Sequence, residues 1–204
     1  MSTPRFETSV VTVWPYCKYI AKERLKNNIT QWHVYEYGPD IELMGAVGEL
    51  AARRLLGLPE KLHTGHDGGT DFIYKGLRVN VKATHLTPLV NFRHLQWRII
   101  NPVNCDIAIL VGVDMIIKKA RMLGYATREQ ILKSPVNYKR RYPCHEIQVP
   151  ELNPNEELIN ANYLSNRHTV NPRYVRQALY APVDAGRFVV GAGSHGRRVL
   201  TLPR

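Results

Sequence analysis

The chain has 204 residues, of which 44% are hydrophobic, enough for one ordinary domain with a proper core and a short extension. A net charge of +11 favours a polyanionic partner, above all nucleic acid, although solubility alone can also explain it. No run reaches the ~20 apolar residues of a membrane span, the N-terminus lacks a signal-peptide layout, and three widely spaced cysteines argue against a zinc site or a disulfide framework. We therefore expect a protein of the reducing cytoplasm with no membrane partner.

The first predicted elements are a short strand at residues 8–14 and a helix that Pro15 opens, with the sequence PYCKYIAKERLKNN. The basic residues of this helix spread widely around it, which favours a solvated face: Lys18, Lys22, Arg24 and Lys26. Residues 31–37 read as an extended, aromatic segment.

A second helix is predicted to start at Asp40, a good N-cap, and its apolar residues follow the i, i+3, i+4, i+7 spacing. Gly45 and Gly48 lie inside it, where each costs roughly 1 kcal/mol relative to alanine, so something is expected to approach that surface closely. Glu49 flanks the apolar stripe and is predicted to point toward whatever the helix packs on. The simpler alternative is a solvent-facing Glu49 paired with Arg53, four residues later.

Residues 68–85, GGTDFIYKGLRVNVKATH, have the pattern of a β-hairpin. Lys75-Gly76 is the predicted two-residue turn, in which Gly76 tolerates the positive φ that tight turns need. This turn sets Asp71 directly opposite Asn80 on the neighbouring strand.

Lys82 is then the diagonal neighbour of Asp71, roughly 7 Å or less away. Because side chains alternate across a strand, Asn80 and Lys82 share the polar face of the hairpin. A carboxylate, an amide oxygen and an ammonium group on one patch suit a divalent cation, a polarised water and a phosphate. The same residue types are also common on the wet face of any hairpin, and it is Glu49, upstream on the helix, that favours a functional site.

Further along, residues 105–114 form an apolar run that predicts a central strand buried on both faces. Residues 115–126 are predicted to be its antiparallel neighbour. Thr127 and Gln130 form a capping box for a short helix that ends at Ser134.

Two basic segments follow. The YKRRY stretch at residues 138–142 suits backbone phosphates and aromatic stacking, with a plain charged loop as the alternative. Residues 166–204 hold seven arginines, no lysine and one acid, a net of 7 − 1 = +6, and we expect a DNA-binding or oligomer-forming extension. The candidate nucleic-acid-binding residues in these segments are Lys139, Arg140, Arg141, Arg197 and Arg198.

The order of these motifs resembles the PD-(D/E)XK nuclease superfamily, which includes restriction enzymes, phage exonucleases and Holliday junction resolvases. In particular, the chain looks like small phage-encoded nucleases with a G-x-x-G-E helix, a G-x-D-F segment and a V-D-V-K-x-T strand. Here these read GAVGE, GTDF and VNVKAT, and the later segment MLGYATREQIL is similar as well, so that the resemblance covers about residues 40–133. It implies an α/β, restriction-endonuclease-like core in residues 1–165, with a mixed sheet of about four or five strands flanked by helices.

The resemblance further implies a metal-dependent endodeoxyribonuclease that hydrolyses DNA phosphodiester bonds, located in the host cytoplasm if a phage encodes it. Mg²⁺ or Mn²⁺ would be held by Glu49, Asp71, Asn80 and the backbone carbonyl of Val81. Lys82 would orient or help deprotonate the attacking water and stabilise the charge that grows on the phosphate. Double-stranded DNA is the expected partner, and a homodimer or higher homo-oligomer the expected assembly.

Asn80 departs from this family, which has Asp or Glu at the position. Two explanations stay open: either the natural protein has asparagine here, or the asparagine replaces an original aspartate, a substitution of the kind made to trap uncut DNA. The intact surroundings favour the second. The alternative functions are a non-catalytic DNA-binding module that kept the nuclease fold, for which Asn80 argues, and an RNA-directed binder or nuclease, for which the basic tail argues.

Overall fold

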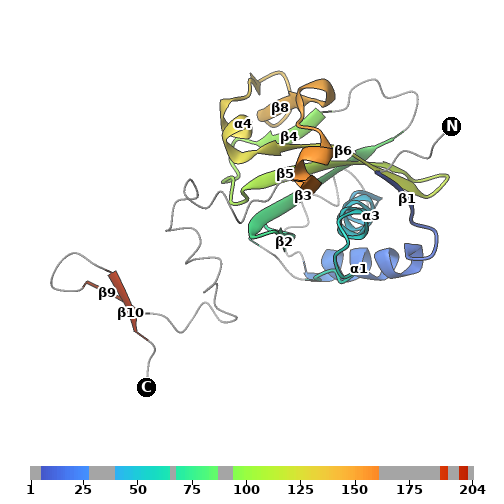
Figure 1. Cartoon of the computed structure of the whole chain (residues 1–204), viewed down its shortest axis with the longest axis horizontal. Helices are drawn as coiled ribbons and strands as arrows, with labels where there is room; N and C mark the ends of the chain where they lie inside the picture. Colours follow the sequence, from blue (N-terminus) through green and yellow to red (C-terminus); the bar gives the residue numbers. More distant parts are fainter. Residues whose placement is uncertain are drawn as a thin grey trace. The chain divides into compact units, whose positions relative to one another are not determined.

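The structure is a computed structural model of the chain (Figure 1) and describes these residues: 6–27, 40–64, 68–86, 94–160, 189–192 and 198–201. The last two stretches are described by their backbone alone. The chain divides into two compact units, Met1–Tyr163 and Leu164–Arg204. Every helix in the described part of the chain is too short or too polar to cross a membrane.

A mixed five-stranded sheet lies at the centre of the described part of the first unit. From one edge to the other its strands are β1 (Glu7–Ser9), β6 (Lys119–Thr127), β5 (Ile107–Asp114), β3 (Leu77–His85) and β2 (Phe72–Tyr74). β3 and β5 run parallel, and the other neighbouring strands are antiparallel. The predicted α/β class and the buried central strand are confirmed, because β5 has strands on both edges and packed layers on both faces.

Helices α3 (Asp40–Leu55) and α1 (Trp14–Asn27) cover one face of this sheet (Figure 1). α3 packs directly on β3 and β5, and α1 packs against α3. The predicted apolar stripe of α3 makes the core, in which Val47 and Leu50 lie in one buried cluster with Val79 and Val111 of the sheet. α3 therefore lies on the valine side of β3, opposite to the side from which Asn80 projects.

Helix α3 approaches the sheet closely at Gly48. A Cβ atom at Gly48 would lie 2.8 Å from the Cβ of Ala83, closer than such atoms come in real structures. At Gly45 nothing lies within 4 Å of the equivalent position. The predicted close approach is therefore confirmed at Gly48, which lies against β3, and wrong at Gly45, where the space is open.

A second, smaller sheet covers the other face, and none of its strands was predicted from the sequence. Its antiparallel strands are β4 (His94–Arg98), β8 (Cys144–Gln148) and β7 (Val136–Asn137). Leu95 and Ile147 from this sheet share a second buried cluster with Ala108 and Leu110 from β5. In Figure 1 helices α1 and α3 accordingly lie on one side of the main sheet, and the second sheet lies on the other.

Short helices complete the first unit. α4 (Arg128–Lys133) starts at the predicted capping box: the Thr127 hydroxyl accepts the Gln130 backbone N–H at 3.2 Å, and the Gln130 side chain accepts the Thr127 N–H at 2.8 Å. The 3-10 turn η1 (Val149–Glu151) leads to α5 (Asn155–Asn160), whose Leu158 is buried in the first cluster.

The β2–β3 hairpin has the predicted turn and register. Lys75 and Gly76 have φ values of 48° and 82°, the positive values that a tight hairpin turn requires. Phe72 pairs with Val79, and Tyr74 with Leu77.

The N-terminal strand is shorter than predicted. β1 ends at Ser9, because residues 11–13 turn into α1. The extended segment predicted at residues 31–37 lies outside the described residues. In the second unit, β9 (Val189–Ala192) and β10 (Arg198–Thr201) pair as an antiparallel hairpin.

Candidate metal and phosphate site

One edge of β3 extends past the end of its partner strand. β2 has three residues and β3 has nine, so β2 pairs only with the start of β3. Asp71 precedes β2 and occupies the next position: its N–H donates to the Val79 carbonyl at 2.8 Å, and its Oδ2 accepts the Val81 N–H. The N–H and C=O of one strand residue point to the same edge, so the Val81 carbonyl also faces this edge.

Asn80 lies opposite Asp71 in this register and is 6% exposed. Its Nδ2 donates to the Gly69 carbonyl at 3.2 Å. Its Oδ1 is buried and has no hydrogen-bond partner among the described residues. The alternative of a wet hairpin face is therefore wrong for Asn80, because the second sheet and the loop before β2 pack over that face.

Glu49 is buried, at 2% exposure, rather than facing solvent. Its Oε2 accepts a hydrogen bond from Nη2 of Arg24 at 2.6 Å, and its Oε1 accepts one from Nε of Arg53 at 3.2 Å. Arg53 also donates through Nη2 to the Asp71 carbonyl at 2.7 Å. Arg53 thereby links the Glu49 carboxylate on α3 to the backbone of Asp71 beside β3.

The prediction of a solvated face on α1 is confirmed for Lys18, Lys22 and Lys26, which are exposed, and is wrong for Arg24. Its side chain is 16% exposed, and its Nε donates to the His63 carbonyl at 2.8 Å. Burial alone would lower the pKa of Arg24, but the hydrogen bond and charge of Glu49, with the charge of Asp71, raise it above its ordinary value. Helix α1 thus places a fixed positive charge against both candidate carboxylates.

Lys82 follows Asn80 on the same face of β3, away from α3. Its ammonium nitrogen lies 4.3 Å from the centroid of the Trp97 ring, which β4 supplies. The charge of Lys82 reaches the neighbouring core as well. Burial raises the pKa of Cys105 to about 11, and the positive charge of Lys82 acts against that rise.

The oxygen donors at this edge suit a hard divalent cation by type, since they are two carboxylates, an amide oxygen and a backbone carbonyl. The orphaned Oδ1 of Asn80 fits such a ligand, because a buried oxygen without a partner costs about 1–3 kcal/mol. The net charge of the side chains around the site suits a cation less well. Among the described residues no group of three or more His, Cys, Asp or Glu side chains could hold an ion.

The formal charge of the site follows from five side chains. Three are positive and two are negative, a net of 3 − 2 = +1, from Arg24, Arg53, Lys82, Glu49 and Asp71. The site as it stands therefore attracts a phosphate more readily than it attracts a lone cation.

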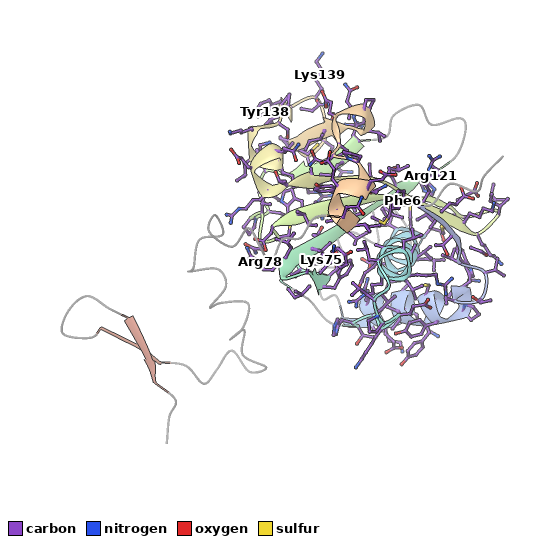
Figure 2. All side chains as sticks on the ribbon, viewed as in Figure 1. Phe6, Lys75, Arg78, Arg121, Tyr138 and Lys139 are labelled. Carbon is purple, nitrogen blue, oxygen red and sulfur yellow. The ribbon has the colours of Figure 1, made fainter. Side chains whose placement is uncertain are left out.

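The predicted basic segment lies on the second sheet, where Tyr138 and Lys139 project from the surface (Figure 2). Arg140 donates through Nε to Glu146 at 2.8 Å, which neutralises part of its charge. The guanidinium groups of Arg98 and Arg141 lie 4.3 and 5.4 Å from the centroid of the Tyr142 ring. Tyr138, which is 73% exposed, is thus the better placed tyrosine for stacking on a base.

The side chains of Arg197 and Arg198 lie outside the described residues, although the backbone of Arg198 begins β10. Two further residues at the site were not predicted from the sequence, Arg24 as a partner of Glu49 and Trp97 as a partner of Lys82. Nothing in the local pattern indicates either pair, because both depend on how separate elements dock.

Comparisons with protein-family models, with curated proteins and with solved structures found no match to this chain. The family resemblance therefore rests on the motifs and on their arrangement.

Proposed function

We propose that this chain is a metal-dependent endodeoxyribonuclease of the restriction-endonuclease-like type, acting on DNA phosphodiester bonds at the β2–β3 edge. The observation that carries the proposal is the Oδ1 of Asn80, which is buried without a partner directly across from Asp71. A buried oxygen of this kind needs a partner, which an ion or an ordered water can supply. A divalent cation is the ligand that the neighbouring oxygens favour.

Mg²⁺ or Mn²⁺ would be held by the side chains of Asp71, Asn80 and Glu49 and by the Val81 carbonyl. When bound, the ion polarises the phosphoryl oxygen and lowers the pKa of the attacking water. Both carboxylate oxygens of Glu49 accept hydrogen bonds from arginines. Glu49 can therefore bind the ion only when its hydrogen bond to Arg24 breaks.

The chain's own residues would perform the remaining tasks. The Val81 N–H holds the Asp71 carboxylate at the edge, and Arg53 fixes the Asp71 backbone. Lys82 supplies a fixed positive charge that orients the water and stabilises the charge growing on the phosphate. Lys139 and Arg141 bind the DNA backbone without reading its sequence.

A second candidate is a non-catalytic module that binds DNA phosphates, and one observation favours it. The site has a net formal charge of +1, and Arg24 and Arg53 already neutralise Glu49. In this alternative the arginines take the place of the cation.

Plasmid cleavage separates the two candidates. The Asn80→Asp variant is assayed with Mg²⁺ and with Mn²⁺, next to the unchanged chain and to Asn80→Asp/Lys82→Ala. The proposal predicts nicking by Asn80→Asp that the Lys82→Ala change abolishes. Absence of cleavage with either metal, together with DNA binding that persists in EDTA, would establish the binding module.

Competition between DNA and RNA at matched salt tests the RNA-directed alternative, since basic proteins bind any polyanion when salt is low.

A further inference from the structure

Lys82 has a long, flexible side chain, yet its ammonium group has a defined neighbour. The nitrogen lies 4.3 Å from the centroid of the Trp97 ring, well inside the roughly 6 Å range of a cation–π contact. Trp97 belongs to β4, so it reaches Lys82 from the second sheet and not from the hairpin. The ammonium group is thus in contact with a separate layer of the fold.

The Trp97 ring is held in place. The side chain is 5% exposed, and its Nε1 donates to the Asn101 carbonyl at 3.0 Å. Its strand position is fixed by pairing with His145 on β8, and Leu95 packs in the same buried cluster. The ring therefore offers a preorganised face to the lysine.

We propose that Trp97 is a positioning residue that fixes the ammonium group of Lys82 at the β3 edge through a cation–π contact. Its catalytic consequence rests on the proposed nuclease function, in which Lys82 acts on the phosphate. A lysine that is misplaced by about 1 Å supplies less stabilisation to the transition state, and such misplacements cost up to roughly 100-fold in rate. A core residue that only filled space would have no such effect.

The chain contains a matched control. Trp14 is 8% exposed, and Nζ of Lys118 lies 5.5 Å from its ring centroid, but Trp14 is the first residue of α1 and packs in the first core. Removing either tryptophan takes a large buried ring from the protein. Only the loss of Trp97 should affect Lys82.

The first measurement is the NMR chemical shift of the Lys82 ε-methylene protons, assigned by their disappearance in Lys82→Met. A ring face at this distance should shift these protons upfield in the unchanged chain. The shift should be lost in Trp97→Leu, partly kept in Trp97→Phe and unchanged in Trp14→Leu. Unshifted ε-protons in the unchanged chain overturn the proposal, and this reading needs only the Lys82→Met variant that assigns them.

The second measurement is kinetic and uses the Asn80→Asp background. Trp97→Leu should lower kcat by on the order of 10- to 100-fold with little change in KM, whereas Trp97→Phe and Trp14→Leu keep most of the activity. Equal kcat values for Trp97→Leu and Trp14→Leu overturn the proposal. Should Asn80→Asp cleave nothing, the proposed nuclease function fails, and the NMR shift alone decides whether Trp97 fixes Lys82.

Discussion

Replacing Glu49 with glutamine should lower the free energy of unfolding by about 3–5 kcal/mol, the usual cost of breaking a buried ion pair. Glu49 is 2% exposed and accepts hydrogen bonds from two arginines, at 2.6 Å from Arg24 and 3.2 Å from Arg53. Glutamine has nearly the same shape but no charge. The variant therefore leaves two largely buried guanidinium groups without their anion, while the packing of α3 on the sheet is unchanged.

Urea unfolding followed by circular dichroism measures this cost, and a loss of that size should lower Tm by roughly 6–20 °C. Glu129→Gln is the matched control. The Glu129–Lys133 pair has the same i,i+4 spacing as Glu49–Arg53, and its atoms lie 2.6 Å apart, but its side chains are 75% and 76% exposed. Solvent screens such a pair, so its removal should have no measurable effect. Equally small effects of both variants would mean that Glu49 is not buried between arginines, and the geometry of the candidate site would be wrong.

Three further predictions concern packing, DNA binding and pH. Gly48→Ala should destabilise the fold by about 1–3 kcal/mol because its Cβ would clash with the sheet, whereas Gly45→Ala, where space is open, should stabilise it by up to about 1 kcal/mol in the same urea titration. In DNA binding measured against salt, Lys139→Ala should reduce the slope of log K against log salt by about one. Glu146→Gln should tighten binding because it frees Arg140 for phosphate. Burial alone would raise the pKa of Glu146, but its hydrogen bonds and the charge of Arg140 lower it below the usual 4.5. This carboxyl therefore contributes stability that is lost as the pH falls below 4.5 through the folded pKa, and Glu146→Gln should flatten that part of the stability curve.

The sequence predicted best those elements that depend on residues close together in the chain. The Lys75-Gly76 turn fixes the hairpin register without help from the rest of the chain, and Thr127 with Gln130 fixes the start of α4. The central strand β5 was equally clear, because an apolar run of that length has no solvated face.

The second sheet could not be predicted in the same way. Its strands β4 and β8 are five residues each and come from distant parts of the chain. Neither has a turn signal that joins it to the other, so their pairing depends on tertiary packing over Ala108 and Leu110. The residues that contact Glu49 and Lys82 also depend on tertiary packing, because α1 supplies Arg24 and β4 supplies Trp97. A single sequence therefore identified the residues that resemble a catalytic set, but not the residues that position and neutralise them.

The neutral side chain at position 80 changes the order in which ligands can bind. With a net formal charge of +1 from its five ionised side chains, the site favours a phosphate over a lone divalent cation. A bound phosphodiester brings one negative charge, which offsets the positive charge of the site and favours binding of the ion. In the proposed enzyme DNA and metal should therefore bind cooperatively. Thermodynamic linkage makes this coupling reciprocal: DNA must raise the affinity for Mn²⁺ by the same factor by which Mn²⁺ raises the affinity for DNA. Asn80→Asp lowers the charge of the site by one unit, which should let the ion bind alone and weaken the coupling. If a short oligonucleotide leaves Mn²⁺ affinity unchanged in the chain with Asn80, the ion and the phosphate do not share this edge of β3.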